Sequence, residues 1–333
     1  MPDRFATPLG RDAMLQVMDR IMSGQISEPE LRDFLTTLAR RGETAEEIAA
    51  AVEALRRCAV RLPLANPSNL CDTCGTGGDG QGTINVSTLA ALVAAAGGVR
   101  IAKHGNRAAS SRCGSADVLE ALGLNLAATP AQVARCIDEV GFGFCFAPAF
   151  HPAMKVVAPV RRALGIRTLF NLVGPLANPA PLAYQLVGVS DSRLLAPMAE
   201  ALQRLGLEHG LVVHGMDGLD EVTLTAQTEA LEITPAAIRS LRLSPEALGL
   251  PRAAAQTLRG GDAAHNASRA RAILGGEASA QRDLVAANAG CVLYVAGRAA
   301  SPREGVAKAV ALLDAGEGLT LLERVTQRMG ADA

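Results

Sequence analysis

The sequence predicts an α/β protein, in which a small all-α N-terminal domain precedes a larger α/β domain with a central, mainly parallel sheet flanked by helices. Two observations carry this prediction. Apolar residues recur at helical spacing through residues 10–60, whereas beyond about residue 65 short apolar runs alternate with alanine-rich stretches. Such alternation is typical of strand–helix–strand units, whose strands lie parallel with helices on the faces of the sheet.

Two capping boxes mark helices in the N-terminal part. Ser27-Glu-Pro-Glu30 and Thr44-Ala-Glu-Glu47 both have the form in which a hydroxyl and a carboxylate satisfy the first unpaired amides of a helix. Apolar side chains follow each box at helical spacing, and Gly24 and Gly42 separate the segments. We therefore expect short helices whose apolar stripes form a core, or alternatively face another subunit.

Five apolar runs predict strands, at 99–103, 142–146, 185–189, 210–214 and 291–296. Helices are expected at 88–97, 115–122, 130–140, 193–206, 263–274 and 303–315. Right-handed crossovers between parallel strands bring the following loops to one edge of the sheet, where ligands bind in such folds. The loops that contain Gly75, Lys103 and His214 should therefore meet at one site.

A segment rich in proline and glycine, 148–182, interrupts the alternation. It contains one helix-like piece, Val156 to Leu164, and is interpreted as a hinge or as a return of the chain to the helical domain. The predicted organisation is a helical domain over 1–68 with a return segment near 152–180, and an α/β domain over 69–151 and 181–333.

Composition narrows the class of protein. Of the 333 residues, 49% are hydrophobic and only 3% aromatic, which predicts a folded chain with an aliphatic core. A net charge of −1 supplies no overall basic field, so neither nucleic acid nor an anionic membrane is an expected partner. The N-terminus lacks a signal-peptide pattern and the sequence lacks an apolar run of membrane-spanning length, so a cytoplasmic protein is expected.

The seven cysteines are scattered and odd in number, which favours reduced thiols over a disulfide framework. Cys71 and Cys74 form a C-x-x-C pair, which could be redox-active or half of a zinc site. No second pair at zinc spacing exists in the sequence. The favoured interpretation is two small residues in a strand that leads into the glycine-rich segment after it.

That glycine-rich segment, Gly75-Thr-Gly-Gly-Asp79-Gly80, lets backbone amides crowd onto one small anion. It is neither a Walker loop nor G-x-G-x-x-G, and a plain tight turn is the alternative. Asn85-Val-Ser-Thr88 follows, just before an apolar helix. Ser87 or Thr88 is a good N-cap, and the start of a helix favours phosphate, so simple capping and phosphate binding are compatible here.

A second polar cluster, Lys103-His-Gly-Asn-Arg107, follows a predicted buried strand, and Ser110, Ser111 and Ser115 come after it. A solvated surface cluster is the usual interpretation of such charges. Two cations, an imidazole and a glycine directly after a buried strand are better explained by binding of an anion, most simply a phosphate or diphosphate.

Two further features suit the same site. Asp220-Glu221, in a glycine-containing loop, offers the oxygen ligands that magnesium prefers when it joins carboxylates to substrate phosphates, with an ordinary acidic turn as the alternative. Arg161 carries a planar guanidinium suited to a carboxylate, provided that it faces the cleft. His151 nearby is a lone histidine, a type that is more often structural than catalytic.

Taken together, these segments resemble the anthranilate phosphoribosyltransferase family over nearly the whole chain. The matching blocks include the glycine-rich segment, Asn85 to Thr88, Lys103 to Arg107, Gly114-Ser-Ala-Asp-Val-Leu-Glu120, Phe146-Ala-Pro148, His151-Pro-Ala-Met-Lys155, Pro159-Val-Arg161, Gly165-Ile-Arg-Thr168, Phe170-Asn171, Gly174-Pro-Leu176 and Asp217-Gly-Leu-Asp-Glu221. Any one block alone is a weak signal, but so many in order are a strong one.

The resemblance implies transfer of phosphoribosyl from phosphoribosyl diphosphate (PRPP) to anthranilate in tryptophan biosynthesis, a magnesium requirement, an active site between the two domains and a homodimer formed through the helical domain. The implied PRPP-binding residues are Gly75, Gly78, Asp79, Thr83, Asn85, Val86, Ser87, Thr88, Lys103, His104, Gly105, Asn106, Arg107, Ala108, Ala109, Ser110, Ser111 and Ser115. The implied anthranilate contacts are Gly75, Asn106 and Arg161, and the implied magnesium ligands are Ser87, Asp220 and Glu221.

Two alternatives stay open at this point. A pyrimidine nucleoside phosphorylase shares the architecture by resemblance, although such chains are generally longer and carry a different lysine motif. A homologue that binds nucleic acid without catalysis would be expected to have a basic surface, which the net charge of −1 opposes.

Overall fold

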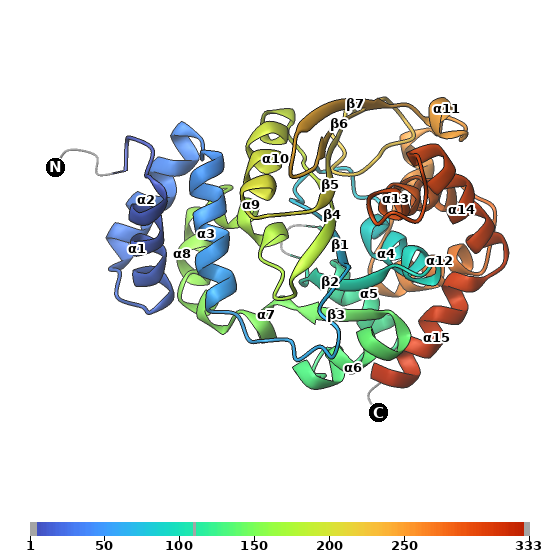
Figure 1. Cartoon of the computed structure of the whole chain (residues 1–333), viewed down its shortest axis with the longest axis horizontal. Helices are drawn as coiled ribbons and strands as arrows, with labels where there is room; N and C mark the ends of the chain where they lie inside the picture. Colours follow the sequence, from blue (N-terminus) through green and yellow to red (C-terminus); the bar gives the residue numbers. More distant parts are fainter. Residues whose placement is uncertain (1–4, 109–110, 330–333) are drawn as a thin grey trace.

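A seven-stranded sheet organises the chain in the computed structural model, which describes residues 5–108 and 111–329 (Figure 1). The strand order is β3-β2-β1-β4-β5-β6-β7. Neighbours from β3 to β5 pair in parallel, whereas β5, β6 and β7 pair antiparallel. The strands are β1 Leu70–Gly75, β2 Arg100–Gly105, β3 Phe142–Phe146, β4 Leu182–Gly188, β5 His209–Gly215, β6 Thr228–Ile233 and β7 Ile238–Leu243. The predicted mainly parallel sheet is confirmed, with an antiparallel extension at one edge.

Three helices precede the sheet, and most others connect or cover its strands. The first three are α1 Arg11–Met22, α2 Glu28–Arg41 and α3 Ala45–Arg57. Those between β1 and β4 are α4 Val86–Ala96, α5 Ser115–Ala121, α6 Pro130–Val140, α7 Ala147–Phe150, α8 Ala158–Leu164 and α9 Leu169–Val173. The remaining ones are α10 Leu195–Arg204, α11 Pro245–Leu248, α12 Ala263–Leu274, α13 Ala280–Val295, α14 Pro302–Asp314 and α15 Glu317–Met329.

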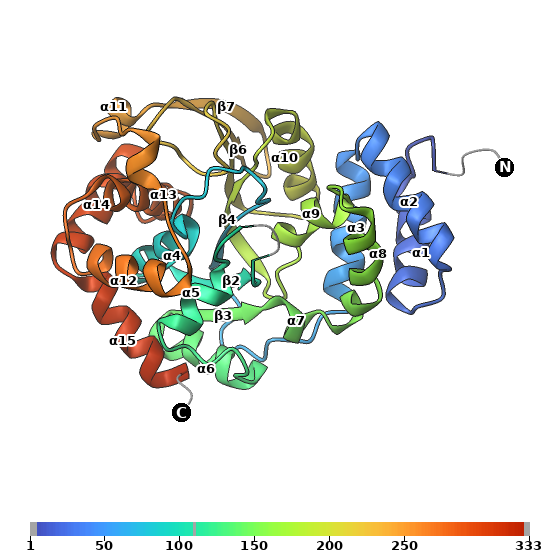
Figure 2. The same ribbon diagram turned by 180° about the vertical axis from the view of Figure 1, so that it is seen from behind.

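Two hydrophobic cores occupy the two faces of the sheet. Leu186 of β4 belongs to the core shared with α4 and α13, whereas the next residue, Val187, belongs to the core shared with α10 and α1 to α3. This split follows from the alternation of side chains along a strand. The helical N-terminal part therefore packs against the larger part through a continuous apolar core, and it forms one end of the molecule in both views (Figures 1 and 2).

The proline-rich segment returns to the helical N-terminal part. Val160 of α8 and Leu169 of α9 lie in the same core as Leu35 and Val52, and α8 and α9 both contact α2. The hinge interpretation therefore gives way to the return of the chain, although the domain boundaries given above stay a prediction.

The structure corrects several expectations. Residues 291–296 were expected as a strand but belong almost entirely to α13, a helix buried all round, and an apolar run alone cannot distinguish that case from a buried strand. Strands β6 and β7 and helix α15 were not predicted. Helix α4 begins one residue after Asn85, so neither Ser87 nor Thr88 is its N-cap.

Cys71 and Cys74 are two small residues of a strand, as the favoured interpretation had it. Because they are three residues apart in β1, Cys71 packs into the core with α4, and Cys74 into the core with α10. Burial raises the pKa of both thiols. A pair divided between two faces can form neither a disulfide nor half of a zinc site.

Among the residues that the structure describes, none of the helices has both the length and the apolar character to cross a membrane.

The buried carboxylate of Glu47 ties the helical N-terminal part together. It completes the predicted capping box at Thr44, accepts a hydrogen bond from the Leu9 amide at 2.8 Å and forms an ion pair with Arg41. Burial alone would raise the pKa of Glu47, but Arg41 and the amides of Leu9 and Thr44 outweigh it and lower that pKa. Ser27 is the N-cap of α2, as predicted, and its hydroxyl accepts from the Glu30 amide, whereas the Glu30 carboxylate pairs with Arg20.

We expect Glu47→Gln to lower the Tm at pH 7 by roughly 5 °C, because it leaves Arg41 half-buried without its partner. The folded-state pKa of Glu47 lies below its ordinary value of 4.5. The stabilisation is therefore present above about pH 4.5 and disappears as the pH falls through the folded-state pKa. Thermal unfolding of both proteins between pH 7 and pH 3 tests this, with exposed Glu28→Gln as the control. A Tm difference that does not shrink in acid would contradict it.

Candidate functional site

The candidate site lies at the carboxyl ends of β1 and β4, between which the strand order reverses. The chain runs outward from β1 through β2 to β3 on one side, and from β4 to β5 on the other, which makes this gap the topological switch point. Asp220 lies against the carboxyl ends of both strands. A Cβ atom at Gly75 would overlap the Asp220 carboxylate, and one at Gly188 would overlap the Asp220 carbonyl oxygen. Glycine at both strand ends is what lets Asp220 approach so closely.

The glycine loop, residues 75–80, is anchored at its first half. The amide of Thr76 donates to the Gly188 carbonyl at 2.9 Å, and the amide of Gly77 donates to Oδ2 of Asp220 at 2.7 Å. These two amides are therefore already occupied. The amides of Gly78 and Asp79 have no protein acceptor among the described residues, and Gly78 has a φ of 76°, which favours glycine. Both amides are therefore available to a ligand.

The stretch after the glycine loop is held by a distant part of the chain. Thr83 pairs with Arg259 in an isolated antiparallel bridge. Asn85 accepts a hydrogen bond from the buried Asn266 at 2.9 Å and donates to the Cys113 carbonyl at 3.1 Å. Val86 and Thr88 lie buried in the first turn of α4 and support this stretch from beneath. Contacts with distant residues, rather than local hydrogen bonds, thus fix the positions of Thr83 and Asn85.

Two carboxylates, Asp220 and Glu221, lie beside the glycine loop, close to the carboxylate of Asp79 in that loop. Asp220 and Glu221 are buried, and Glu221 accepts a hydrogen bond from the Ser87 amide at 3.1 Å. Burial, together with the charge of Asp79, raises the pKa of Asp220 to about 7. Burial and the charge of Asp220 raise the pKa of Glu221 well above its ordinary value. The structure thus places Asp220 and Glu221 next to each other and Ser87 beside Glu221. The crowded negative charge of Asp79, Asp220 and Glu221 suits a hard cation.

Lys103 was expected to be one of two cations that bind an anion. Its side chain is buried, and its Nζ donates to the Thr73 carbonyl. The nearby Asp72 carboxylate accepts from Asn178 at 2.8 Å, and burial raises its pKa to about 6 even though Lys103 opposes this. The buried cation therefore lies among carboxylates, where it offsets part of their charge.

His104, the next residue, is a buried neutral imidazole. It packs edge-on against His151 with ring centroids 5.2 Å apart, and burial lowers its pKa to about 3. The Nε2 atoms of both rings are buried without a hydrogen-bond partner within the described part of the chain. The neutral ring of His104 lines a cavity, and its role in binding PRPP stays a prediction.

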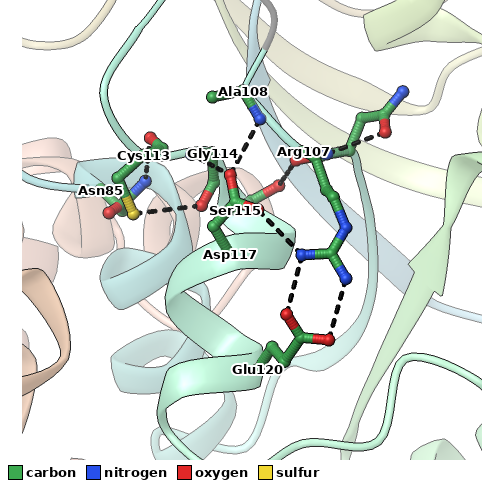
Figure 3. Close-up of polar contacts among 9 residues, drawn as sticks. Asn85, Arg107, Ala108, Cys113, Gly114, Ser115, Asp117 and Glu120 are labelled. Atoms are coloured by element: carbon green, nitrogen blue, oxygen red, sulfur yellow. Dashed lines mark hydrogen bonds and ion pairs between the residues drawn. The ribbon is translucent and has the colours of Figure 1, made fainter. Parts of the chain in front are cut away.

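The loop after β2 folds back onto α5 (Figure 3). Ser115 donates from its hydroxyl to the Asn106 carbonyl at 3.2 Å, and a Cβ at Gly105 would overlap that hydroxyl. Arg107 is exposed but paired with Asp117 and Glu120, at 3.0 and 2.7 Å. Ser111 is exposed, Ala108 is half-buried, and Ala109 and Ser110 lie outside the described residues.

A cavity of about 420 Å³ opens between the helical N-terminal part and the sheet. Gly75, Asn106 and Arg161 all line it, as do Leu55 of α3 and Phe170 of α9. The guanidinium of Arg161 lies 5.7 Å over the Phe170 ring and 3.3 Å from Oδ1 of Asn171. Burial lowers the pKa of Arg161. The cavity therefore has a cationic wall at one side and the glycine loop at the other.

Sequence reasoning gave no role to several residues that shape the site. Arg167 donates to the Ser190 hydroxyl at 2.7 Å and reaches the Gly77 carbonyl at 3.4 Å. Asp72 and Asn178 surround Lys103. Arg167 lies in a matched block, and Asp72 lies three residues before the glycine loop, so both had a positional signal; Ser190 had none.

The chain matches two sequence-family models in consecutive order. The helical bundle domain of a glycosyl transferase family matches residues 6–59, and the a/b domain of that family matches residues 67–319.

Relatives align over nearly the full length. The anthranilate phosphoribosyltransferase of Rubrobacter xylanophilus is 51% identical, over 95% of this chain and 92% of the relative. The crystal structure of the Thermus thermophilus enzyme superimposes with a TM-score of 0.93 at 49% identity, over 97% of each chain. The Saccharomyces cerevisiae enzyme in complex with PRPP and Mg superimposes with a TM-score of 0.85 at 28% identity, over 96% of this chain and 92% of that one.

We expect Gly188→Ala to lower the Tm on the order of 5 °C, because the new methyl group would overlap the Asp220 carbonyl oxygen and push it from the switch point. Gly10→Ala is the matched control, since a Cβ there meets nothing within 4 Å. Differential scanning calorimetry of both variants measures the effect. Equal Tm values for the two variants would show that Asp220 is not held by this contact.

Proposed function

The chain belongs to the anthranilate phosphoribosyltransferase family, and we propose that it transfers the phosphoribosyl group of PRPP to the amine of anthranilate, releasing diphosphate, in tryptophan biosynthesis. The observation that carries this proposal is the cavity whose walls are Arg161 on one side and Gly75 and Asn106 on the other. A guanidinium suits the carboxylate of a flat aromatic acid, and the opposite wall leads to the glycine loop and its acidic neighbours.

The PRPP site proposed here runs along the carboxyl ends of β1 and β2. The amides of Gly78 and Asp79, the stretch from Thr83 to Thr88 and the loop from Lys103 to Ser115 would hold the sugar and its phosphates. A Saccharomyces cerevisiae relative has been solved with PRPP and Mg, and another structure of that enzyme contains 4-fluoroanthranilate. Both ligands fit the division into a phosphate-binding edge and an aromatic cavity.

Magnesium is the cation that this site would take. Ser87, Asp220 and Glu221 supply hard oxygen atoms, and the raised pKa values of both carboxyls reflect burial and crowded negative charge that a cation would neutralise. In the described residues, no group of three or more His, Cys, Asp or Glu side chains forms a complete metal cage. Substrate phosphate oxygens would therefore complete the coordination, and bound magnesium would withdraw charge from the departing diphosphate.

The chemistry asks mainly for positioning and electrostatic stabilisation. As the bond from ribose C1 to the diphosphate oxygen breaks, positive charge grows on the sugar and the electron pair leaves with diphosphate. The amides of Gly78 and Asp79 would stabilise that leaving group. The aromatic amine is neutral and nucleophilic at pH 7, so its attack on C1 needs no strong general base. The proton that the nitrogen loses as the new bond forms passes to water or to the released diphosphate. Arg161 would hold the carboxylate so that the amine faces C1.

Two further aspects complete the proposal. We propose a homodimer formed through the helical N-terminal part, and a cytoplasmic location. No nucleic acid or membrane is expected to take part, in keeping with the net charge of −1.

The direct test of the function is the loss of anthranilate fluorescence on incubation with the protein, PRPP and magnesium. Omission of PRPP or of magnesium should abolish the loss. Phosphorolysis of pyrimidine nucleosides is assayed in parallel, and a salt-dependent gel shift tests nucleic-acid binding. Phosphorolysis without consumption of anthranilate would replace the proposal by the nucleoside phosphorylase alternative.

We expect Arg161→Ala to raise KM for anthranilate about 10- to 100-fold, because a charge-assisted hydrogen bond to the carboxylate is lost. KM for PRPP should stay within about twofold. Arg162→Ala is the matched control, since Arg162 is the next residue of α8 but is exposed and does not line the cavity. Steady-state kinetics with each substrate varied decide the point. An unchanged KM for anthranilate would remove Arg161 from the aromatic site.

We expect Asp220→Asn combined with Glu221→Gln to lower kcat about 100-fold or more and to raise the magnesium concentration needed for half-maximal rate. Exposed Glu208→Gln, which removes one negative charge directly before the amino end of β5, should change neither quantity. The measurement is initial rate against magnesium concentration at saturating PRPP. A double variant with the wild-type magnesium dependence would place the cation elsewhere.

A further inference from the structure

Asp117, the third residue of α5, uses both carboxylate oxygens to bind the loop that follows β2 (Figure 3). Its Oδ2 accepts hydrogen bonds from the amides of Ala108, at 2.9 Å, and Gly114, at 2.8 Å. Its Oδ1 accepts from Arg107 at 3.0 Å. A single side chain thus holds Arg107 and Ala108 at one end of the loop and Gly114 at the other.

The backbone around this contact is closely packed. A Cβ atom at Gly114 would overlap the Ala108 amide nitrogen and approach the Asn106 carbonyl oxygen to 2.7 Å. The same Asn106 carbonyl accepts from the Ala116 amide at 3.1 Å and from the Ser115 hydroxyl. The backbone of Asn106, which lines the aromatic cavity, is therefore fixed to the first turn of α5 beside Asp117.

Glu120, one turn further along α5, provides a natural comparison. It takes both Nη atoms of Arg107, at 2.7 and 2.8 Å, and it is more exposed than Asp117, at 50% against 21% of the side chain. Among the described residues, its carboxylate contacts Arg107 but no backbone amide. The two carboxylates share one guanidinium, and only Asp117 also holds the loop.

The charges at this cluster limit what Arg107 can do. Two carboxylates against one guanidinium leave a net charge of about −1, so Arg107 offers little attraction to an incoming phosphate. The pKa of Asp117 lies below its ordinary value because the two amides and Arg107 outweigh the effect of burial. Asp117 therefore stays ionised and keeps its hold on the loop at neutral pH.

We propose that Asp117 is a positioning residue for PRPP: it fixes Arg107, Ala108 and Gly114 against α5 so that these parts of the loop are preformed for the sugar phosphate, and Arg107 serves as its structural partner rather than as the main phosphate cation. This inference rests on the proposed function, because it assigns a role within the PRPP site. Preforming the loop matters because an unfixed loop would have to be ordered by the substrate, which lowers affinity.

Asp117→Asn is the decisive variant, since the amide retains the shape but cannot accept from three donors at once. Calorimetric titration with PRPP and magnesium should show Kd raised about 10-fold or more, and steady-state kinetics should show KM for PRPP raised in parallel. KM for anthranilate and kcat should stay within about threefold. Glu120→Gln removes the same charge next to the same Arg107 without touching the backbone, and should change Kd by no more than about threefold.

Two further variants serve as a distant control and as a substitute for Asp117→Asn. Glu246→Gln breaks an exposed pair with Arg252 far from the loop and should leave PRPP binding unchanged. If Asp117→Asn does not fold, Gly114→Ala displaces the Ala108 amide from the same contact and should raise Kd for PRPP to a similar extent.

The outcomes separate this inference from the proposed function. Absence of PRPP binding by the wild-type protein would overturn the proposed function and with it the inference. Wild-type binding with an unchanged Kd in Asp117→Asn would overturn the inference alone. Equal losses in Asp117→Asn and Glu120→Gln would also overturn it, since they would assign the effect to Arg107 and its charge rather than to the loop.

Discussion

The close approach of Asp220 to the ends of β1 and β4 is the contact on which the rest of the site depends. The Asp220 carbonyl lies against Gly188, and its carboxylate lies against Gly75. The same carboxylate accepts a hydrogen bond from the Gly77 amide. The loop after β5, the glycine loop and the end of β4 are therefore fixed relative to one another at the switch point of the sheet. A side chain on either glycine would separate them, so the geometry follows from the absence of two Cβ atoms.

The same contact concentrates negative charge in a buried place. Burial and the charge of Asp79 raise the pKa of Asp220, and burial and the charge of Asp220 raise the pKa of Glu221. Lys103 only partly offsets this charge, because a single cation faces both Asp72 and Glu221. Buried carboxylates of this kind are costly unless they are protonated or paired with a cation. This cluster of carboxylates therefore favours a bound cation, in agreement with the proposed metal-bearing anionic substrate.

The two sides of the site are held by different means. The edge that we propose to bind phosphate is held by polar contacts, in which Arg167, Asn266 and Asp117 each fix one loop segment. The aromatic cavity lies instead between two parts of the chain that share one hydrophobic core, with Leu55 on the helical side. Hydrophobic burial is non-directional, whereas hydrogen bonds fix positions, which suits a flat ligand on one side and phosphates on the other.

The sequence by itself determined the helical N-terminal part, the alternation behind the mainly parallel sheet, and the motif residues that line the switch point, because capping boxes, periodicity and glycine clusters are local signals. It could not distinguish a buried helix from a strand at 291–296, since both are uniformly apolar. Only the tertiary structure decided that Lys103 is buried, that His104 is neutral and that Arg107 is paired with Asp117 and Glu120. Those properties depend on which distant groups surround a side chain and how much water reaches it, and neither is encoded in the local pattern of residues.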